Sequence, residues 1–314
     1  MTMHCTVIGI DVAKDSLSLY RADQDQAGTL ANEPRAIAAW LRGLPRECSL
    51  AIEATNTYHV AVAVLAHKRG HRVYMIDGYR LSNYRKGIGG RVKNDLCDAR
   101  LLARYLSHEQ HQLQPWSPPS RAYRKLQALL HRRATLVRNM TALRLSFAQD
   151  RQLKAALDTV LQSMKALERK LDQALQETLD EAGLAAQARR CQAIEGIGPI
   201  SAAALSLAFL RGTFRSSDSF IAFLGLDVRV RESGRYIGRR KLTKQGDPEI
   251  RRLLYTAAMA ASRTVAWKDC YQGYLQRGLK RTEALVILAR KLARIAFAVM
   301  RSQKPYRPRV ATAD

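Results

Sequence analysis

Apolar residues in the first third of the chain occur in short runs that alternate with helical patterns. Residues 33–43 and 58–69 space their apolar side chains as amphipathic helices do, and another helix is predicted from Asn94 through Leu106. Four apolar runs have the length and composition of strands: residues 5–11, 16–22, 49–54 and 71–76. This alternation is typical of an α/β layer structure, so we predict a mixed-sheet domain over residues 1–110.

The middle of the chain predicts long helices. Residues 121–179 contain neither proline nor glycine, and two apolar heptad series flank a polar stretch at 148–152. The series are Leu126, Leu129, Leu136, Met140, Leu143 and Phe147, then Leu153, Leu157, Val160, Met164, Leu167 and Leu171. An antiparallel hairpin and a bent helix both fit, as do an intramolecular bundle and an intermolecular coiled coil. Since a Pro-rich segment begins at 111, we assign residues 111–185 to a coiled-coil linker.

Residues 186–314 are predicted to form a mostly helical domain. Strand-like pieces at 226–230 and 235–243 flank a basic turn. In the last helix, an apolar stripe is explained by core packing, and its members are Leu285, Leu288, Leu292, Ile295 and Val299. The opposite, outer face is predicted to be basic, through Arg290, Lys291, Arg294 and Arg301.

Charge distinguishes the C-terminal part from the rest of the chain. The 314 residues carry a formal charge of +25, and residues 191–314 alone hold 23 basic and nine acidic residues. Uncompensated positive charge of this size favours a nucleic-acid partner. The sequence has neither a signal-peptide pattern nor an apolar run of the ~18 residues that span a membrane, so we expect a soluble, cytoplasmic protein without a membrane partner. The five cysteines lack metal-site spacing, and we expect reduced thiols.

Four carboxylates are placed where they could converge. Asp11 and Glu53 each end an apolar strand, and if these strands are neighbours the two side chains lie together at one edge. Asp95 and Asp98 are three residues apart, so on a helix they share a face. Like charges this close are costly without a cation between them. Taken singly, each has a simpler explanation, since Asp95 with Asp98 could form a capping box, Asp11 could favour a turn and Glu53 could be a surface residue.

Together, the strand-end Asp, the strand-end Glu and the later Asp-x-x-Asp helix fit the ribonuclease H-like pattern. Carboxylate oxygens suit Mg²⁺, and two ions about 4 Å apart would stabilise the entering and leaving oxygens of an in-line phosphoryl transfer. We therefore expect Mg²⁺ as the cofactor, with up to two ions per site and Mn²⁺ as a substitute.

A glycine-rich turn in the last domain offers a phosphate contact. Gly196 and Gly198, in the sequence Gly-Ile-Gly-Pro between two helical runs, match a helix-hairpin-helix turn. Glycines let the backbone approach a phosphodiester, and the following helix adds free N–H groups. A plain helix–helix turn explains the motif equally well.

The segment 227–255 is the most basic of the chain. Its proposed nucleic-acid contacts are Arg229, Arg231, Arg235, Arg239, Arg240, Lys241, Lys244, Arg251 and Arg252. Ser233 lies among them, next to cations that could hold a phosphate, which suits a nucleophile, although a turn serine before glycine is the commoner role and no general base is evident beside it. Asp247 and Pro248 are typical of an N-cap and first helical residue.

With these residues in hand, the chain resembles the DEDD-type insertion-sequence transposases, a family of bridge-RNA-guided serine recombinases. The resemblance covers nearly the full length. It rests on GIDVAKDSL, AIEATNTY, KNDLCDARLLA, AIEGIGPISA, SFIAFLGLDVR and RESGRYIGRRKLTKQGDPEIRRLLY, with the heptad segment in the middle. It implies a RuvC-like domain, a coiled coil, and a C-terminal transposase domain bearing the nucleophilic serine.

The resemblance also implies roles for individual residues. Asp11, Glu53, Asp95 and Asp98 would bind Mg²⁺, and Ser233 would attack a DNA phosphodiester to form a transient phosphoserine link. The resemblance also implies an active site built across protomers and a bacterial, nucleoid-associated protein. Donor and target DNA would be the substrates, an element-encoded structured RNA would guide their choice, and the protein would be a homo-oligomer, a dimer that pairs into a tetramer on DNA.

Two other functions remain as alternatives. One is a Mg²⁺-dependent junction-resolving endonuclease in which water is the nucleophile. The other is an architectural nucleic-acid binder whose four carboxylates are structural. A covalent protein–DNA adduct separates the first from a recombinase, and metal-dependent strand cleavage excludes the second.

Overall fold

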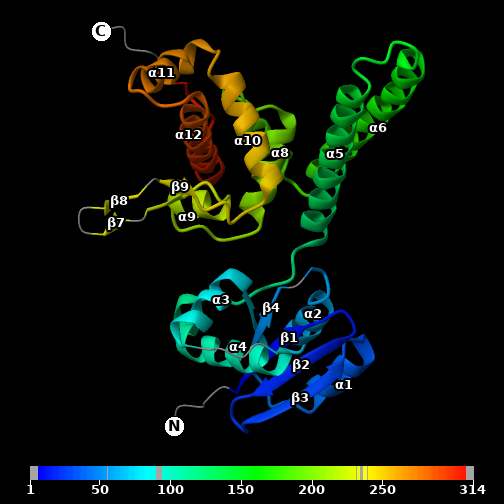
Figure 1. The fold of residues 1–314 in the computed structure, drawn as a ribbon, viewed down its shortest axis with the longest axis vertical. Helices are drawn as coiled ribbons and strands as arrows, with labels where there is room; N and C mark the ends of the chain where they lie inside the picture. Colours follow the sequence, from blue (N-terminus) through cyan, green and yellow to red (C-terminus); the bar gives the residue numbers. More distant parts are fainter. Residues whose placement is uncertain are drawn as a thin grey trace. The chain divides into compact units, whose positions relative to one another are not determined.

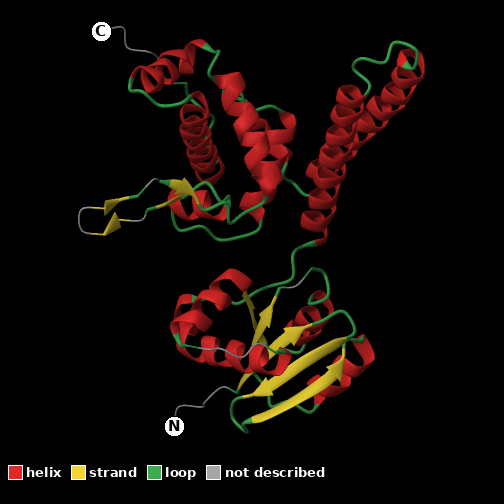
Figure 2. Cartoon of the chain, viewed as in Figure 1, coloured by secondary structure: helices red, strands yellow, loops and turns green. Residues whose placement is uncertain are grey.

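The computed structural model describes residues 6–54, 56–89, 94–230, 232–233, 236–238 and 240–308. The predicted contacts Arg231, Arg235 and Arg239 lie outside these residues. The chain divides into two compact units, Met1–Pro118 and Pro119–Asp314. Figure 2 shows the strands of the five-stranded sheet in the first unit and the mostly helical composition of the second.

A five-stranded mixed sheet forms the centre of the first unit. Its strand order is β3-β2-β1-β4-β5. The pairs β1–β2 and β2–β3 are antiparallel, and the pairs β1–β4 and β4–β5 are parallel. The strands are β1 Val7–Val12, β2 Ser16–Arg21, β3 Gln26–Ala31, β4 Ser49–Glu53 and β5 Arg72–Ile76. The mixed sheet predicted from the sequence is confirmed. The sequence did not reveal β3, because this edge strand is mostly exposed and lacks an apolar run.

Helices cover both faces of this sheet (Figure 1). One face packs Ile8 and Ile10 against α1 and α2, and the other packs Ala51 and Tyr74 against α3 and α4. The helices are α1 Pro34–Arg42, α2 Val60–Lys68, α3 Gly78–Gly87 and α4 Asp95–Glu109, followed by a 3₁₀ turn, η1 Gln110–Gln112. Gly9 lets α4 come close to β1, because a Cβ atom there would overlap the carbonyl oxygen of Ala99.

The second unit begins with a helical hairpin. Helices α5 Arg121–Ser146 and α6 Lys154–Glu181 run antiparallel side by side, so the hairpin alternative is the correct one (Figure 1). Leu136, Met140 and Leu161 pack between the two helices. Arg133 of α5 joins both Glu168, at 2.7 Å, and Asp172 of α6.

The rest of this unit is a helical domain with two short ladders. Its core joins α8, α10 and α12, and the base of the hairpin packs against it. The helices are α7 Ala185–Gln192, α8 Pro199–Leu210, α9 Ser217–Phe223, α10 Pro248–Ala261, α11 Val265–Gln276 and α12 Arg281–Ser302. Strand β6 Val228–Arg229 pairs with β9 Lys241–Leu242, and β7 Glu232–Ser233 pairs with β8 Tyr236–Ile237.

The last helix differs from the sequence prediction on its basic side. Leu285, Leu288 and Leu292 are buried as predicted. The prediction of an outward basic face holds only in part for Arg290 and Arg294, because the Nε atom of each is buried although the Arg294 side chain is 42% exposed. Neighbouring elements cover more of α12 than one apolar stripe suggests. None of the described helices is both long and apolar enough to cross a membrane.

Candidate carboxylate site and basic arm

Asp11 lies in β1 next to the end of the neighbouring strand that carries Glu53. The parallel pairing sets Ile10 of β1 opposite Ile52 of β4, so Asp11 and Glu53 occupy the next position of the register. The backbone N–H of Val12 donates to Asp11 Oδ1 at 3.0 Å. The sheet therefore sets the backbones of Asp11 and Glu53 at adjacent positions, and a site shared by their side chains stays a prediction.

Helix α4 brings the other two carboxylates to Asp11. The N-cap of α4 is Asn94, whose side chain accepts a hydrogen bond from the N–H of Cys97 at 2.7 Å. The capping explanation of Asp95 and Asp98 is therefore wrong, and neither carboxylate is needed for the cap. Asp98 is buried, with 8% of its surface exposed, whereas Asp95 is exposed.

Two other carboxylates influence Asp11 electrostatically. Burial raises the pKa of Asp11 above its ordinary value, and the charges of Asp98 and Asp95 raise it further. The Val12 N–H and the positive charge of Arg85 act in the opposite direction. A cation placed here would relieve the repulsion that raises the pKa of Asp11.

Arg85 is the residue of this site that sequence reasoning missed. It lies on α3 and forms a salt bridge with Asp98, and both side chains are largely buried. Helix α3 has a single buried apolar residue, Leu81, so no periodicity pointed to the helix or to its arginine.

Glu53 reaches a different neighbour. Its side chain extends to the start of α3, where a Cβ atom on Gly78 would overlap Glu53 Oε1. In the part of the chain that the structure describes, no three His, Cys, Asp or Glu side chains are gathered closely enough to hold a metal ion. The donor chemistry of Asp11, Asp95 and Asp98 nevertheless fits a hard divalent cation, because carboxylate oxygens are the ligands that Mg²⁺ prefers.

Ser233 lies on a short, exposed arm of the second unit. We define the basic arm as residues 228–242, from β6 to β9. Ser233 of β7 is exposed and pairs with Tyr236 of β8. Arg229, Arg240 and Lys241 of the arm and the neighbouring Lys244 are also exposed. Arg240 lies 3.6 Å from Glu232 in a solvent-accessible ion pair.

The base of the arm is fixed by hydrogen bonds. The Thr243 hydroxyl donates to the Asp227 carboxylate, and the Thr243 N–H donates to the Asp227 carbonyl at 3.0 Å. Asp247 is the N-cap of α10 and Pro248 its first residue, as predicted. His131 of the hairpin lies 2.9 Å from Asp247.

Two predicted nucleic-acid contacts have partners inside the unit. Arg251 donates to the carbonyl of Gly246 at 2.6 Å, and Arg252 forms a salt bridge with Glu249 at 2.5 Å. Burial lowers the pKa of Arg251, whereas the hydrogen bond to Glu249 raises that of Arg252. Both arginines therefore help to hold α10 and the loop before it.

The glycine turn before α8 has a packing role. Gly196 has φ +85°, and a Cβ atom there would lie 2.7 Å from the Ala261 nitrogen. Gly198 is the exposed N-cap of α8, with Pro199 as the first helical residue. Packing against α10 thus explains Gly196, while Gly198 is the position that leaves backbone accessible.

Comparisons with known proteins give one consistent result. A family model named for DEDD transposases of the IS110 type matches residues 8–162, and one described as "Transposase IS116/IS110/IS902 family" matches residues 188–272. The chain is 28% identical to a pilin gene-inverting protein of Moraxella bovis, over 98% of this chain and 99% of the relative. It is 29% identical to a probable family 20 transposase of Pseudomonas aeruginosa, over 98% of this chain and 100% of the relative.

A solved structure is also similar in part. It is titled "T. thermophilus RuvC in complex with Holliday junction substrate", covers 36% of this chain and 100% of its own, and has 17% sequence identity and a TM-score of 0.27.

Proposed function

Since the chain belongs to the IS116/IS110/IS902 family of transposases, we propose that it exchanges DNA strands through a covalent link to Ser233. Family membership supports an enzyme that acts on DNA in transposition or recombination. The observation that carries the proposal is the order of the two family matches, one over the carboxylate site and the other over Ser233.

The proposed reaction uses the exposed serine as nucleophile. Ser233 Oγ attacks a DNA phosphorus, its proton leaves, and the P–O bond to the departing strand breaks as that strand's oxygen takes up a proton. The hydroxyl of the partner strand then attacks the phosphoserine, the P–Oγ bond breaks and Ser233 is protonated again. Each step replaces one phosphodiester by another, so the exchange needs no external energy source.

Cations of the arm would orient the DNA backbone for this attack. Arg229, Arg240 and Lys241 are exposed on the two strands at the base of the arm. Fixed positive charges there would neutralise phosphates on either side of the attacked one and stabilise negative charge that develops during the transfer.

We propose that Asp11, Asp95 and Asp98, with Glu53 beside them, hold divalent metal, Mg²⁺ or Mn²⁺. Bound metal would supply Lewis-acid stabilisation of the phosphate and of the leaving oxygen. The raised pKa of Asp11 supports this assignment, because burial and then the charges of Asp98 and Asp95 disfavour its ionised form, which a bound cation would stabilise. Arg85 would release Asp98 when the metal binds and balance its charge when it does not.

Further parts of the proposal concern fold, assembly and guidance. The sheet order β3-β2-β1-β4-β5 supports a RuvC-like, ribonuclease H-like first domain, and the hairpin would connect it to the transposase domain.

Exposed Leu153, Val160 and Leu167 recur every seven residues, which favours a coiled-coil contact with a second copy. We propose a dimer that forms a tetramer on DNA. We also propose an element-encoded guide RNA, and the net charge of +25 supports this nucleic-acid partner.

A covalent adduct tests the central step. We would incubate end-labelled DNA from the flanks of the gene with the protein, its co-purified RNA and Mg²⁺, and separate the products on a denaturing gel. We expect a protein–DNA adduct that disappears in Ser233→Ala and persists in Ser217→Ala, a serine at the start of α9. Cleaved free ends without any adduct would overturn the serine mechanism and favour the junction-resolving endonuclease that uses water.

A further inference from the structure

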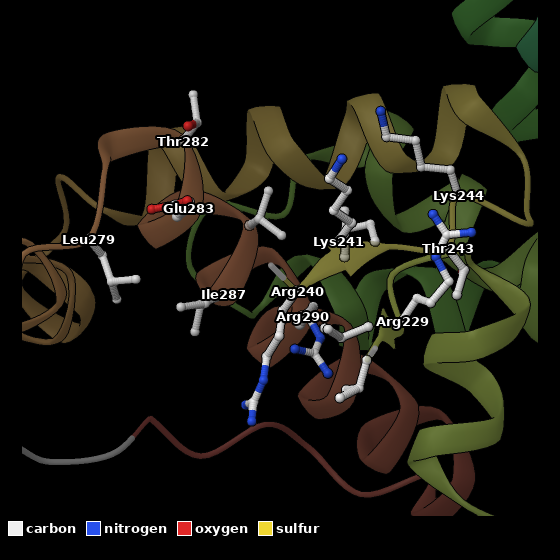
Figure 3. Close-up of a pocket in the computed structure, with 14 residues that line it drawn as sticks. Arg229, Arg240, Lys241, Thr243, Lys244, Leu279, Thr282, Glu283, Ile287 and Arg290 are labelled. Carbon is white, nitrogen blue, oxygen red and sulfur yellow. The ribbon is translucent and has the colours of Figure 1, made fainter. Parts of the chain in front are cut away.

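A large cavity opens at the base of the basic arm (Figure 3). One side is formed by residues 228–230 and 240–244, and the other by Leu279 and the first turns of α12. Its volume is about 1050 Å³. Pockets for small ligands commonly measure about 300–1,000 Å³. The cavity therefore has room for a whole nucleotide rather than for a single side chain or ion.

Two chemically different walls face this space. Leu279, Val286 and Ile287 supply a half-buried aliphatic surface. Figure 3 shows Leu279 and Ile287 on one side and Arg229, Arg240 and Arg290 grouped on the other. An apolar wall beside a cationic one suits a ligand with a flat, weakly hydrated part and an anionic part, and a nucleotide has both in its base and its phosphate.

The positive charge of the cavity is only partly neutralised, through the solvent-accessible ion pair of Arg240 with Glu232. Arg290 Nε is buried and has no hydrogen-bond partner among the described residues. Burial lowers the pKa of Arg290, as does nearby Arg294, with Asp218 and Asp227 acting against them. The one carboxylate of the lining, Glu283, accepts a hydrogen bond from the N–H of Lys280 at 3.0 Å and so serves the helix start. An anion in the cavity would gain from this unbalanced charge.

The cavity also lies close to the proposed nucleophile along the chain. Arg229 and Ser233 are separated by four residue steps, which span at most about 14 Å when fully extended. Duplex DNA rises about 3.4 Å per base pair, so this reach corresponds to about four base pairs. A nucleotide held by Arg229 would thus belong to the DNA immediately around the phosphate that Ser233 attacks.

We propose that this cavity receives one nucleotide extruded from the DNA strand beside the phosphodiester that Ser233 attacks. The base lies on Leu279, Val286 and Ile287, and its phosphate faces Arg229, Arg240 and Arg290. Taking a base out of the stack fixes the position of the strand relative to the arm and unpairs DNA where strands must change partners. This inference rests on the proposed function and names the part of the substrate that the arm recognises.

The test compares two single-stranded oligonucleotides of equal length, one of thymidines and one with abasic sites in place of every base. Both carry the same phosphates, so fluorescence anisotropy with the purified full-length protein isolates the contribution of the base. We expect the wild-type protein to bind the thymidine strand about tenfold more tightly, because the base would bury apolar surface on the aliphatic wall of the cavity. Ile287→Asn should abolish most of this preference, and Val265→Asn should keep it, because Val265 is 89% exposed on α11 outside the cavity.

The outcomes separate this inference from the proposed function. Equal, salt-dependent binding of both strands by the wild-type protein would overturn the cavity assignment and leave the DNA-binding proposal standing. Absence of salt-dependent binding to either strand would remove the proposed function and the inference with it. Full base preference in folded Ile287→Asn would also overturn the assignment. If that variant does not fold, Val286→Asn serves in its place, with circular dichroism to confirm folding.

Discussion

Asp98 and Ser233 are held by very different surroundings. Asp98 lies on a fifteen-residue helix that packs against a five-stranded sheet, is 8% exposed, and is paired with Arg85. Ser233 lies on a two-residue strand, is exposed, and is paired across a two-residue ladder. Asp98 is thus positioned by the core of its unit. Ser233 is positioned by a few backbone contacts and by the hydrogen-bonded base of the arm.

The difference matches what each group has to do in the proposed reaction. Metal ligands must keep fixed mutual positions, and sites built on packed helices and strands do this best. A nucleophile that attacks DNA must be accessible to a large polymer, and surface segments with few buried contacts provide that access. Cleavage and stability at the carboxylate site should therefore be sensitive to changes of single residues and of close packing contacts. In the arm, each charge should make only a small contribution to DNA binding.

The largest effect is expected for Asp11→Asn. Loss of the central carboxylate should reduce Mg²⁺-dependent strand cleavage at least a hundredfold, because it removes a ligand of the proposed metal site. DNA binding should be unchanged, since the cations proposed to contact phosphates belong to the second unit of the chain. Cleavage on a denaturing gel and binding by electrophoretic mobility shift would be measured together.

Asp15→Asn is the matched control, because Asp15 is an exposed carboxylate four residues along the same segment. It should retain wild-type cleavage. If Asp11→Asn cleaved DNA as fast as Asp15→Asn and the wild-type protein, the carboxylate site would not be where the chemistry takes place. The architectural DNA-binding role would then gain support.

The packing of α4 against β1 beside the carboxylate site is tested by Gly9→Ala. The added methyl group would overlap the Ala99 carbonyl of α4, so the helix would have to move away from β1. We expect a loss of about 3 kcal/mol in the free energy of unfolding, at the upper end for overpacked cores. Gly28→Ala, on the exposed strand β3, should change stability by no more than about 1 kcal/mol, because its Cβ would meet no described atom within 4 Å. Urea denaturation of both variants checks this, and matching midpoints would mean that the α4–β1 contact is not tight.

The sequence allowed the strands and the helix that carry the proposed carboxylate ligands to be predicted, because strands and helix faces follow simple periodicities. Asp11 and Glu53 follow apolar runs, and the Asp95–Asp98 spacing defines one helix face. Arg85 could not be predicted in the same way. Its helix has one buried apolar residue, and its pairing with Asp98 depends on the packing of α3 beside α4.

The arm shows a different limit of sequence reasoning. The density of basic residues predicted a polyanion-binding segment, but charge density does not reveal which cations are free. Arg251 and Arg252 bond within their own unit, and Arg290 is half-buried at the cavity instead of on an outer face. The bonds of Arg251 and Arg252 are local, within five residues along the chain. Arg290, by contrast, lines a cavity together with β6 and β9, which are distant from α12 in sequence.

A smaller, distributed effect is expected for Lys241→Ala. Removing one exposed phosphate contact should weaken binding of duplex DNA a few-fold and lower the slope of log affinity against log salt by about 1. Lys165→Ala, which removes an exposed lysine from α6 of the hairpin, is the control and should leave the slope unchanged. A loss of all binding in Lys241→Ala would contradict the distributed character of the arm.

The smallest effect concerns the stability of the metal-free protein. Because the folded pKa of Asp11 is raised above 3.8, the folded state keeps the proton at pH values where the unfolded state has released it. Stability therefore falls as the pH rises from 3.8 to the folded pKa, and the loss persists above it. Asparagine has no proton to release, so Asp11→Asn should be more stable than the wild-type protein at neutral pH.

Urea denaturation at several pH values, without metal and then with Mg²⁺, measures this gap in stability. The gap should shrink as the pH falls below 3.8, where Asp11 is protonated in both states. It should also narrow with Mg²⁺, because a bound cation stabilises the ionised carboxylates of the wild-type protein. If Asp11→Asn were less stable than wild type at neutral pH, the Asp11 carboxylate would be stabilising the fold, for example through its bond to the Val12 N–H. Burial and carboxylate repulsion would then not dominate the energetics of Asp11.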